Sequence, residues 1–495
     1  MQTQLPDNAG IGEYHLVSDL FVRLLGIFYL IAFVSLAMQI DGLVGPSGIL
    51  PLGQHLDRLH AAYGANSYWL LPTLFWFDSG SIALTGACWL GAALAVLVAW
   101  KRWQLFALIV CYALYLSLYH AGQIFLNFQW DGLLLEAGFL AIFLVALPGR
   151  AKGVVIYLFR WLLFRLRFLS GISKLVSLDP AWSGLTALNV YFQVQPLPTP
   201  LAWYAHQLPE WLLKTGTGLT LVVEILVPFM MFLPRRWRFA AAWVTIFWQV
   251  LILLTSNHNW FNLLTIALCL FLFDDKAVAR VLPSRWKIAP QARQATMAHG
   301  ILAWSLAAVL VPITTLQVVE LATGMGQDAW RVPGVAGQVV DESERLGIAH
   351  KYHVFPTMKP DRYELEIQGS LDGKEWRNYH YRYKPEALDR MPGLWAPGVV
   401  IPHQPRLDWM SWFVTLHPSF VPWFYEFLVG LKESRPAVLA LLANNPFPDH
   451  PPAYLRVNVY RYRFTTPQER ENTGNRWARE ALGPFPPLQG LPMPE

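Results

Sequence analysis

Long runs of apolar residues recur through the first two thirds of the chain, and they constrain its fold more than any other feature. Runs of about 17–22 residues are long enough to cross a bilayer as α-helices. They lie near residues 19–40, 81–100, 104–120, 132–147, 154–172, 217–233, 238–254, 258–273 and 299–320. Only 14% of the 495 residues are charged, against about 25% in soluble domains. The sequence therefore predicts a polytopic α-helical membrane protein with about nine spans.

Basic residues cluster in alternate connections between these runs. They lie in WKRW at 100–103, GRAK at 149–152, PRRWR at 234–238 and the stretch 276–293. Few Lys or Arg residues occur in the other connections, at 41–79, 121–131, 173–216 and 255–257. By the positive-inside rule the basic connections face the cytoplasm. An odd number of spans then places everything after about residue 321 on the opposite side.

After the last run the composition changes to that of a soluble domain. RYELEIQGSLDGKEWRNYHYRYKP, at 362–385, alternates polar and apolar residues around an Asp-Gly turn, which predicts a β-hairpin. YLRVNVYRYRF at 454–464 predicts another strand, and 408–431 and 434–444 predict amphipathic helices. We therefore expect a transmembrane domain at 1-323, with a long outer loop at 176-216. We expect a C-terminal soluble α+β domain, mainly antiparallel β, at 324-495 on the non-cytoplasmic side.

The fifth apolar run carries Arg160, Arg165, Arg167 and Lys174. Ionisable groups at membrane depth are costly and usually paired or functional. Arg160 can reach the cytoplasmic interface, whereas Arg165 and Arg167 lie deeper and need partners.

Two carboxylates at similar depth, Glu136 and Glu224, are the candidate partners. Ion pairs between helices would fix the packing of the fourth, fifth and sixth runs. The alternative is an outward-open polar cavity with Lys174 at its mouth, acting as a base or binding an anion. We favour a structural role for the arginines, because arginine stays protonated, and leave both alternatives open for Lys174.

The sequence lacks the motifs of several large protein classes. Its three cysteines, Cys88, Cys111 and Cys269, form no CxxC pair. Hydrolase, Walker and dinucleotide motifs are missing as well. The histidines of the C-terminal part lack zinc-site spacing, and His206 in the outer loop is a better site candidate. We predict no metal, no cofactor and no nucleic-acid partner.

Several long motifs resemble those of the lipase maturation factor family. They are QWDGLLLEAGFLAIF, FRLRFLSGISKL with AWSGLTAL, QVQPLPTPLAWYAHQLPEW, TSNHNWFNLLTIALCLFLFDD, HQPRLDWMSWF and NNPFPDHPPAYLRVNVYRYRF. The resemblance implies a membrane-embedded factor that assists the folding of exported lipases or related secreted proteins. It implies a bacterial-type member in the inner membrane with a periplasmic C-terminal domain, or an endoplasmic reticulum protein if the chain is eukaryotic. The expected partners are the client protein and the lipid bilayer.

The motifs also supply candidate residues for a client-binding site or a functional polar core. These are Arg165, Arg167, Trp182, Gln195, Pro196, His206, Glu136, Glu224, Asn262, Arg406, Asp408 and Trp409. Aromatic residues in PLAWYAHQLPEW and LDWMSWF are expected to offer apolar contacts to a client. Gln193 stands where the family often has an acidic residue.

A weaker similarity points to an enzyme. SGISKL followed by AWSGLTAL is similar to a signature of vitamin K-dependent gamma-carboxylase-like membrane domains, in which the lysine is the catalytic base. The matching residues are Lys174 and Trp182, although the spacing after Leu175 is longer in this chain. An intramembrane enzyme that uses Lys174 in an outward-open polar cavity is therefore the alternative. We favour the non-enzymatic maturation role.

Overall fold

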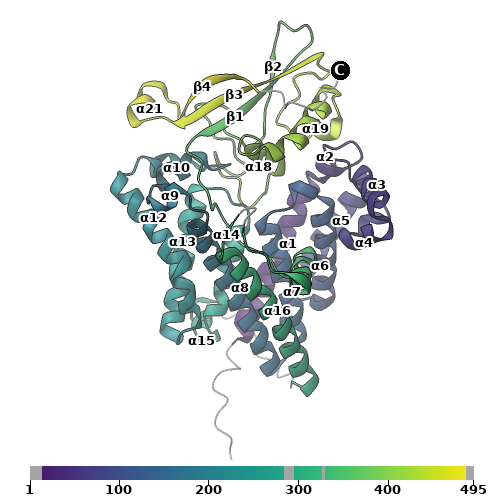
Figure 1. Ribbon diagram of the computed structural model, residues 1–495, viewed down its shortest axis with the longest axis vertical. Helices are drawn as coiled ribbons and strands as arrows, with labels where there is room; N and C mark the ends of the chain where they lie inside the picture. The colour runs from purple at the N-terminus through teal and green to yellow at the C-terminus, as the bar shows by residue number, and fades with distance from the viewer. Residues whose placement is uncertain (1–13, 284–294, 326–328, 486–495) are drawn as a thin grey trace, which may run out of the picture.

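A bundle of long helices forms most of the molecule, and a small domain with a β-sheet lies at one end of it (Figure 1). The computed structural model describes residues 14–283, 295–325 and 329–485. The long helices of the bundle are α1 (His15–Ala37), α5 (Ser81–Ala99), α6 (Gln104–Ala121), α7 (Gln129–Ala146), α8 (Gly149–Val176), α12 (Glu210–Ile225), α13 (Arg235–Thr255) and α16 (Met297–Ala322).

Shorter helices occupy the connections between the long ones. They are α2 (Ile40–Val44), α3 (Leu52–Tyr63), α4 (Ser67–Leu70), α9 (Pro180–Ser183), α10 (Ala187–Val194), α11 (Pro200–His206), α14 (Phe261–Leu268), α15 (Asp275–Val281) and α17 (Gly334–Arg345). The outer loop at 176–216 is thus a series of short helices, as its prolines require.

Seven of the described helices are long and apolar enough to cross a membrane. They are His15–Ala37, Ser81–Ala99, Gln104–Ala121, Gln129–Ala146, Glu210–Phe232, Arg235–Thr255 and Met297–Ala322. The other two expected spans are not confirmed by this criterion. Helix α8 has the length, 28 residues, but carries too many charges, and the eighth run forms only the short apolar helix Phe261–Leu272.

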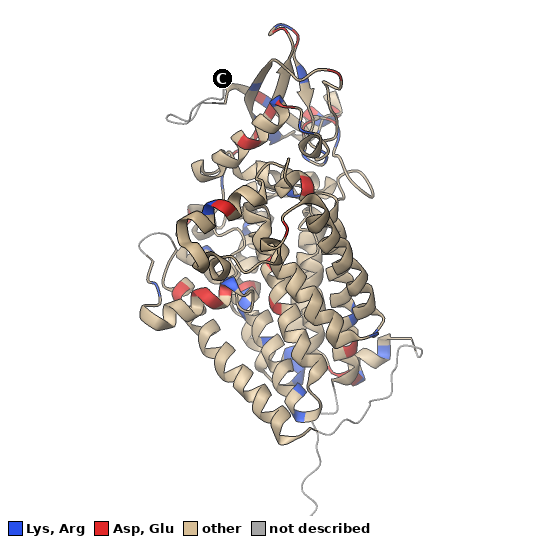
Figure 2. Ribbon diagram, turned by 90° about the vertical axis from the view of Figure 1, so that its right-hand side faces the viewer, with Lys and Arg blue, Asp and Glu red and all other residues tan. Residues whose placement is uncertain are grey.

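Basic residues of the bundle meet at the end opposite the sheet (Figure 2). Lys101, between α5 and α6, forms an ion pair with Asp19 near the start of α1. Arg235, at the start of α13, binds Asp274 at 2.5 Å. The backbone of His15 donates to the Asp275 carboxylate at 2.7 Å. The described basic connections therefore lie on one side, as predicted; Arg285, Lys287 and Arg293 lie outside the described residues.

The C-terminal domain contains one antiparallel four-stranded sheet in the order β2-β1-β3-β4. Its strands are β1 (Arg362–Ser370), β2 (Arg377–Tyr379), β3 (Tyr454–Phe464) and β4 (Trp477–Pro484). The predicted hairpin is confirmed, and Gly373 in its turn has a φ of 73°, which suits glycine. The expected strand at 454–464 is confirmed as β3.

The helices of this domain are shorter than predicted. They are α18 (Arg406–Phe413), α19 (Val421–Lys432), α20 (Pro436–Leu439) and α21 (Pro467–Thr473). The expected single helix at 408–431 is wrong, because the chain breaks between α18 and α19, where Pro418 starts a separate 3-10 turn.

One hydrophobic core runs from the bundle into the C-terminal domain. It joins Phe21 and Leu133 of the bundle to Trp409 and Phe424 of α18 and α19 and to Val457 of β3. The two parts of the chain are thus packed on each other rather than joined only by a linker.

Candidate functional site

Arg165, Arg167 and Lys174 of α8 pair with carboxylates on neighbouring helices, whereas Arg160 donates to Phe271 O at 2.8 Å and to the Tyr14 hydroxyl at 2.7 Å. Arg165 forms a buried ion pair with Glu136 of α7. Arg167 and Lys174 share the Glu224 carboxylate of α12. Arg167 Nη2 lies 3.1 Å from Glu224 Oε1, and Lys174 Nζ lies 2.7 Å from Glu224 Oε2. The interhelical ion pairs expected from the sequence are therefore present. They explain how a helix with this many cations is accommodated among apolar neighbours.

The Lys174 ammonium is surrounded by acceptors. Besides Glu224, Nζ donates to Ser170 O and Val354 O, both at 2.8 Å. The ring of Trp182 lies 5.1 Å away, and the residue is only 4% exposed. These two hydrogen bonds and the ion pair with Glu224 together occupy the ammonium group. Lys174 is therefore buried among its acceptors, and its place at the mouth of an outward-open cavity stays a prediction.

The segment at 345–358 runs from the last residue of α17 toward β1 and lies along α7 and α8, and we call it the strap. Side chains of the bundle donate hydrogen bonds to carbonyl oxygens of the strap: His120 to Arg345 at 2.8 Å, Arg165 to His350 at 3.2 Å, Gln129 to His353 at 2.6 Å, Lys174 to Val354 at 2.8 Å, Trp182 to Phe355 at 3.2 Å and Ser177 to Pro356 at 2.6 Å. The Tyr352 hydroxyl in turn donates to Glu136 Oε2 at 2.7 Å. The cations of α8 therefore bind both carboxylates and the strap.

Two glycines allow these close approaches. A Cβ atom at Gly171 of α8 would lie 2.6 Å from Ile225 Cγ1 and 2.9 Å from Glu224 Cβ. A Cβ atom at Gly132 of α7 would lie 2.8 Å from the ring of His350. Both positions require glycine because the neighbouring atoms come too close for any side chain.

A second buried ion pair joins α18 to the start of α7. Arg406 binds Asp131 with two hydrogen bonds, Nη2 to Oδ1 at 2.7 Å and Nη1 to Oδ2 at 2.9 Å. Arg406 Nη1 also donates to Phe125 O at 2.7 Å, and Tyr115 donates to Asp131 Oδ1 at 2.6 Å. Both charged side chains are almost fully buried. This two-point geometry suits arginine and fixes the C-terminal domain on the bundle.

The outer loop is joined to the C-terminal domain through its backbone. Arg362 of β1 donates to Gln195 O, and to Pro196 O at 3.1 Å. The Gln195 side chain accepts from Ser256 at 2.9 Å and from His258 Nε2 at 3.1 Å. Burial lowers the pKa of His258 to about 4, so the ring is neutral and donates through Nε2.

Asp408 and Trp409 fasten α18 to two different neighbours. Asp408 Oδ1 accepts from the backbone of Tyr383 at 2.7 Å and of Lys384 at 3.2 Å, and burial raises the pKa of this carboxyl to about 6. Trp409 packs edge-on against Trp130 of α7, with ring centroids 5.0 Å apart. Like Trp412, Trp409 is buried, so LDWMSWF does not offer the apolar surface expected of it.

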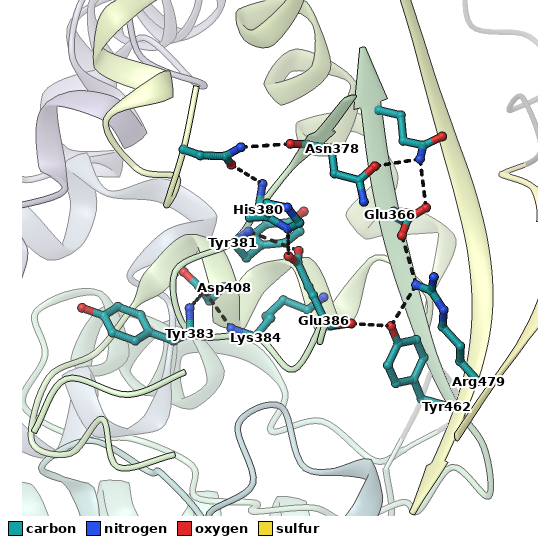
Figure 3. Close-up of polar contacts among 12 residues, drawn as sticks. Glu366, Asn378, His380, Tyr381, Tyr383, Lys384, Glu386, Asp408, Tyr462 and Arg479 are labelled. Atoms are coloured by element: carbon teal, nitrogen blue, oxygen red, sulfur yellow. Dashed lines mark hydrogen bonds and ion pairs between the residues drawn. The ribbon is translucent and has the colours of Figure 1, made fainter. Parts of the chain in front are cut away.

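The loop at 380–386, whose backbone donates hydrogen bonds to Asp408, belongs to a longer polar network (Figure 3). The Glu386 carboxylate binds His380 Nδ1 at 2.7 Å and the backbone N–H of Tyr381 at 3.1 Å. The Glu386 carbonyl accepts from Tyr462 of β3 at 3.0 Å. These contacts fix the loop between the sheet and α18.

Two of the predicted site residues lie in other surroundings. His206 packs against Phe464 at a centroid distance of 5.4 Å, and burial lowers its pKa. Asn262 donates to Gln249 Oε1 at 2.5 Å within the bundle. Within the described ranges, no group of three or more His, Cys, Asp or Glu residues is arranged to hold a metal ion.

The sequence prediction did not include several residues that join the two parts. Asp131 and Asn257 lie inside the motifs QWDG and SNHN, which were the available signal. Asn257 donates to Leu197 O at 3.0 Å and to Gly398 O at 2.9 Å, and it accepts from Val400 N at 2.8 Å. Arg362 likewise lies inside the quoted motif RYELEIQGSLDGKEWRNYHYRYKP, whereas Tyr352 had no comparable signal.

Two protein-family models match the chain, one over the bundle and one over the C-terminal domain. Residues 16–280 match the lipase maturation factor transmembrane domain, and residues 348–487 match the lipase maturation factor C-terminal domain. The chain is 34% identical to lipase maturation factor 2 of Homo sapiens, over 96% of this chain and 83% of the relative, and 32% identical to that of Xenopus laevis, over 95% and 81%. It is 30% identical to lipase maturation factor 1 of Mus musculus, over 98% and 89%.

No solved structure matches the chain. Both matching family models describe lipase maturation factors, and together they cover the bundle and the sheet. The similarity to gamma-carboxylases and the bacterial origin stay predictions. The chain is a member of the lipase maturation factor family.

Proposed function

We propose that this protein is a membrane-embedded maturation factor that assists the folding of exported lipases or related secreted proteins. The observation that carries the proposal is the similarity to lipase maturation factors along 95–98% of the chain. The contacts of Lys174 favour a non-enzymatic role, because a base needs a free lone pair and this ammonium is fully engaged by acceptors.

We place the soluble domain, residues 324–495, on the non-cytoplasmic side and the basic end of the bundle in the cytoplasm. The gathering of basic residues at the end of the bundle opposite the sheet (Figure 2) supports this orientation. In a bacterium the domain would face the periplasm, and in a eukaryote the lumen of the endoplasmic reticulum. Either compartment is one through which exported proteins pass.

We propose that the client contacts the outer loop at α11 and the start of α12. Tyr204 is 52% exposed and Trp211 is 68% exposed, while Trp203 beside them is buried and donates to Thr465 O at 3.0 Å. The loop is therefore fixed on the C-terminal domain yet presents aromatic rings to its surroundings, as a surface for partly folded chains would.

Deletion of the gene, followed by measurement of lipase activity in the exported fraction, tests the function. We expect loss of activity of at least one lipase with its transcript unchanged, and recovery with the wild-type gene. A double variant, Tyr204→Ser with Trp211→Ser, should restore less activity at normal abundance. Tyr454→Ser, also at an exposed aromatic residue, is the matched control and should restore it fully. Unchanged exported lipases after deletion would refute the proposed function, and full rescue by the double variant would refute only the contact surface.

A further inference from the structure

A cavity of about 590 Å³ lies in the connection between α1 and α5. It is formed by α3, α4 and the short 3-10 helix η2 (Leu74–Trp76) with the turn that follows. Its volume lies in the range of about 300–1,000 Å³ that is usual for ligand pockets. None of its lining residues belongs to the contacts described above between the bundle and the C-terminal domain.

Three aromatic rings line the cavity and contact one another. The centroid of Tyr68 lies 4.8 Å from that of Trp76 and 5.7 Å from that of His60, and His60 and Trp76 are 6.4 Å apart. Trp76 is fixed by a hydrogen bond from Nε1 to Leu71 O at 2.8 Å. Aromatic faces around a common space attract cations.

The charged groups of the cavity are all acceptors. The lining includes Asp57 and Asp78 and no Lys or Arg, in a chain whose formal net charge is +5. Asp78 uses Oδ1 to accept from Gly80 N at 2.8 Å. Asp57 has no hydrogen bond or ion pair with any part of the chain that the structure describes. The cavity is thus locally anionic where the protein as a whole is cationic.

His60 adds a third acceptor. The hydroxyl of Ser67 donates to Gly64 O at 2.7 Å, so its contact with His60 Nδ1 at 3.3 Å requires the ring nitrogen to donate. In the neutral ring, Nε2 then carries the free lone pair. Two carboxylates and one imidazole nitrogen match the three N–H donors of a primary ammonium group.

The cavity lies at the end of the bundle where lipid headgroups would be. Thr73 donates to Ser117 O near the end of α6 at 3.0 Å, which is the end opposite Lys101. Arg435 of the C-terminal domain donates to Gly48 O of the same connection at 3.2 Å. Around it, Tyr63, Trp69 and Phe77 are 56%, 57% and 92% exposed, as expected of aromatic residues at a membrane interface.

We propose that this cavity binds the ammonium headgroup of phosphatidylethanolamine from the outer leaflet. The carboxylates of Asp57 and Asp78 and Nε2 of His60 accept its N–H groups, and the rings of Tyr68 and Trp76 cover the charge. A choline headgroup has no N–H donor, so it leaves these acceptors without partners. The site is independent of the proposed client surface.

Native mass spectrometry of the full-length protein, titrated with phosphatidylethanolamine or phosphatidylcholine, tests the proposal. We expect preferential retention of phosphatidylethanolamine, and about tenfold weaker binding for each of Asp57→Asn and Asp78→Asn, since each removes a charge-assisted hydrogen bond. Asp449→Asn, also at an exposed aspartate, is the matched control and should bind as the wild type does.

Three results would overturn the proposal. Equal retention of the two lipids would show that the acceptors do not select the headgroup. Unchanged binding in both Asp57→Asn and Asp78→Asn would place the lipid elsewhere. Equally tight binding of soluble glycerophosphoethanolamine would show that the occupant is a free headgroup rather than a membrane lipid.

Discussion

At the scale of single residues, the buried pair of Arg406 and Asp131 is the most demanding contact between the two parts of the chain. Arg406→Ala leaves the Asp131 carboxylate buried with only Tyr115 as a side-chain donor. We expect a loss of about 3–5 kcal/mol of stability, measured as a lower melting temperature of the purified protein. Arg461→Ala, which removes an exposed pair with Glu480, is the control and should change little.

The paired replacement Arg406→Met with Asp131→Leu distinguishes charge from packing. It removes both buried charges together, so we expect it to be more stable than Arg406→Ala alone. Equal instability of the two variants would contradict the ion-pair account.

Lys174 permits a similar test of its role. Lys174→Met keeps much of the aliphatic stem but leaves Glu224 Oε2 and the carbonyls of Ser170 and Val354 without their donor. We expect lower abundance and a lower melting temperature, with Glu224→Gln restoring part of the loss in the double variant. Normal stability together with complete loss of lipase maturation would refute the structural role.

At the scale of elements, α18 is fastened to the loop at 380–386 by a carboxyl with an unusual pKa. Burial raises the pKa of Asp408 from 3.8 to about 6, so the folded protein binds this proton more tightly than the unfolded chain. Stability from this group therefore rises as pH falls from about 7 to about 4, by on the order of 2–3 kcal/mol. The difference in unfolding free energy between wild type and Asp408→Asn should follow that pH dependence, and a pH-independent difference would contradict it.

The strap should be protected from hydrogen exchange where bundle side chains accept its amides. His353 N donates to Gln129 Oε1 at 2.9 Å, and Met358 N donates to Asp179 Oδ2 at 3.0 Å. Gln129→Ala removes the first acceptor only, so exchange should become faster at His353 and stay unchanged at Met358. Mass spectrometry after deuterium labelling measures both sites. Equal acceleration at the two amides would mean that the strap opens as one unit.

The sequence predicted helices and strands well where the apolar residues recur with the period of the element that buries them. The strand at 454–464 and the long apolar helices were predictable because alternation and long apolar runs are local signals. The partners of Arg165 and Arg167 were predictable as well, because buried cations need carboxylates and few are available. Strand β4 was missed, since WAREALGP has no clear alternation and four consecutive residues in it are exposed.

The strap was also missed, for a different physical reason. Its contacts run through backbone carbonyls, which every residue type has, so the sequence IAHKYHVFPTM carries no signature of them. The same holds for the contacts of Arg362 with Gln195 and Pro196.

At the scale of the whole molecule, the separation of the basic end from the sheet predicts how the protein lies in the membrane. The three native cysteines are buried, so Arg102→Cys and Asp449→Cys can be labelled selectively. We expect an impermeant maleimide added to intact bacterial cells to label residue 449 and not residue 102. In sealed microsomes, whose cytoplasmic face is outside, it should label residue 102, and residue 449 only after the lumen is opened. The reverse pattern would invert our orientation.

The order in which the chain is synthesised determines when the contacts of the strap can form. Glu136 is synthesised 216 residues before Tyr352. The hydroxyl of Tyr352 then completes the hydrogen bonding of the Glu136 carboxylate. The seven candidate membrane helices are therefore made before the segment that lies along α7 and α8. Until that segment is made, Arg165 and Lys174 each lack one carbonyl acceptor, and the nascent bundle differs chemically from the finished one. A protein that helps others to mature thus has a late maturation step of its own.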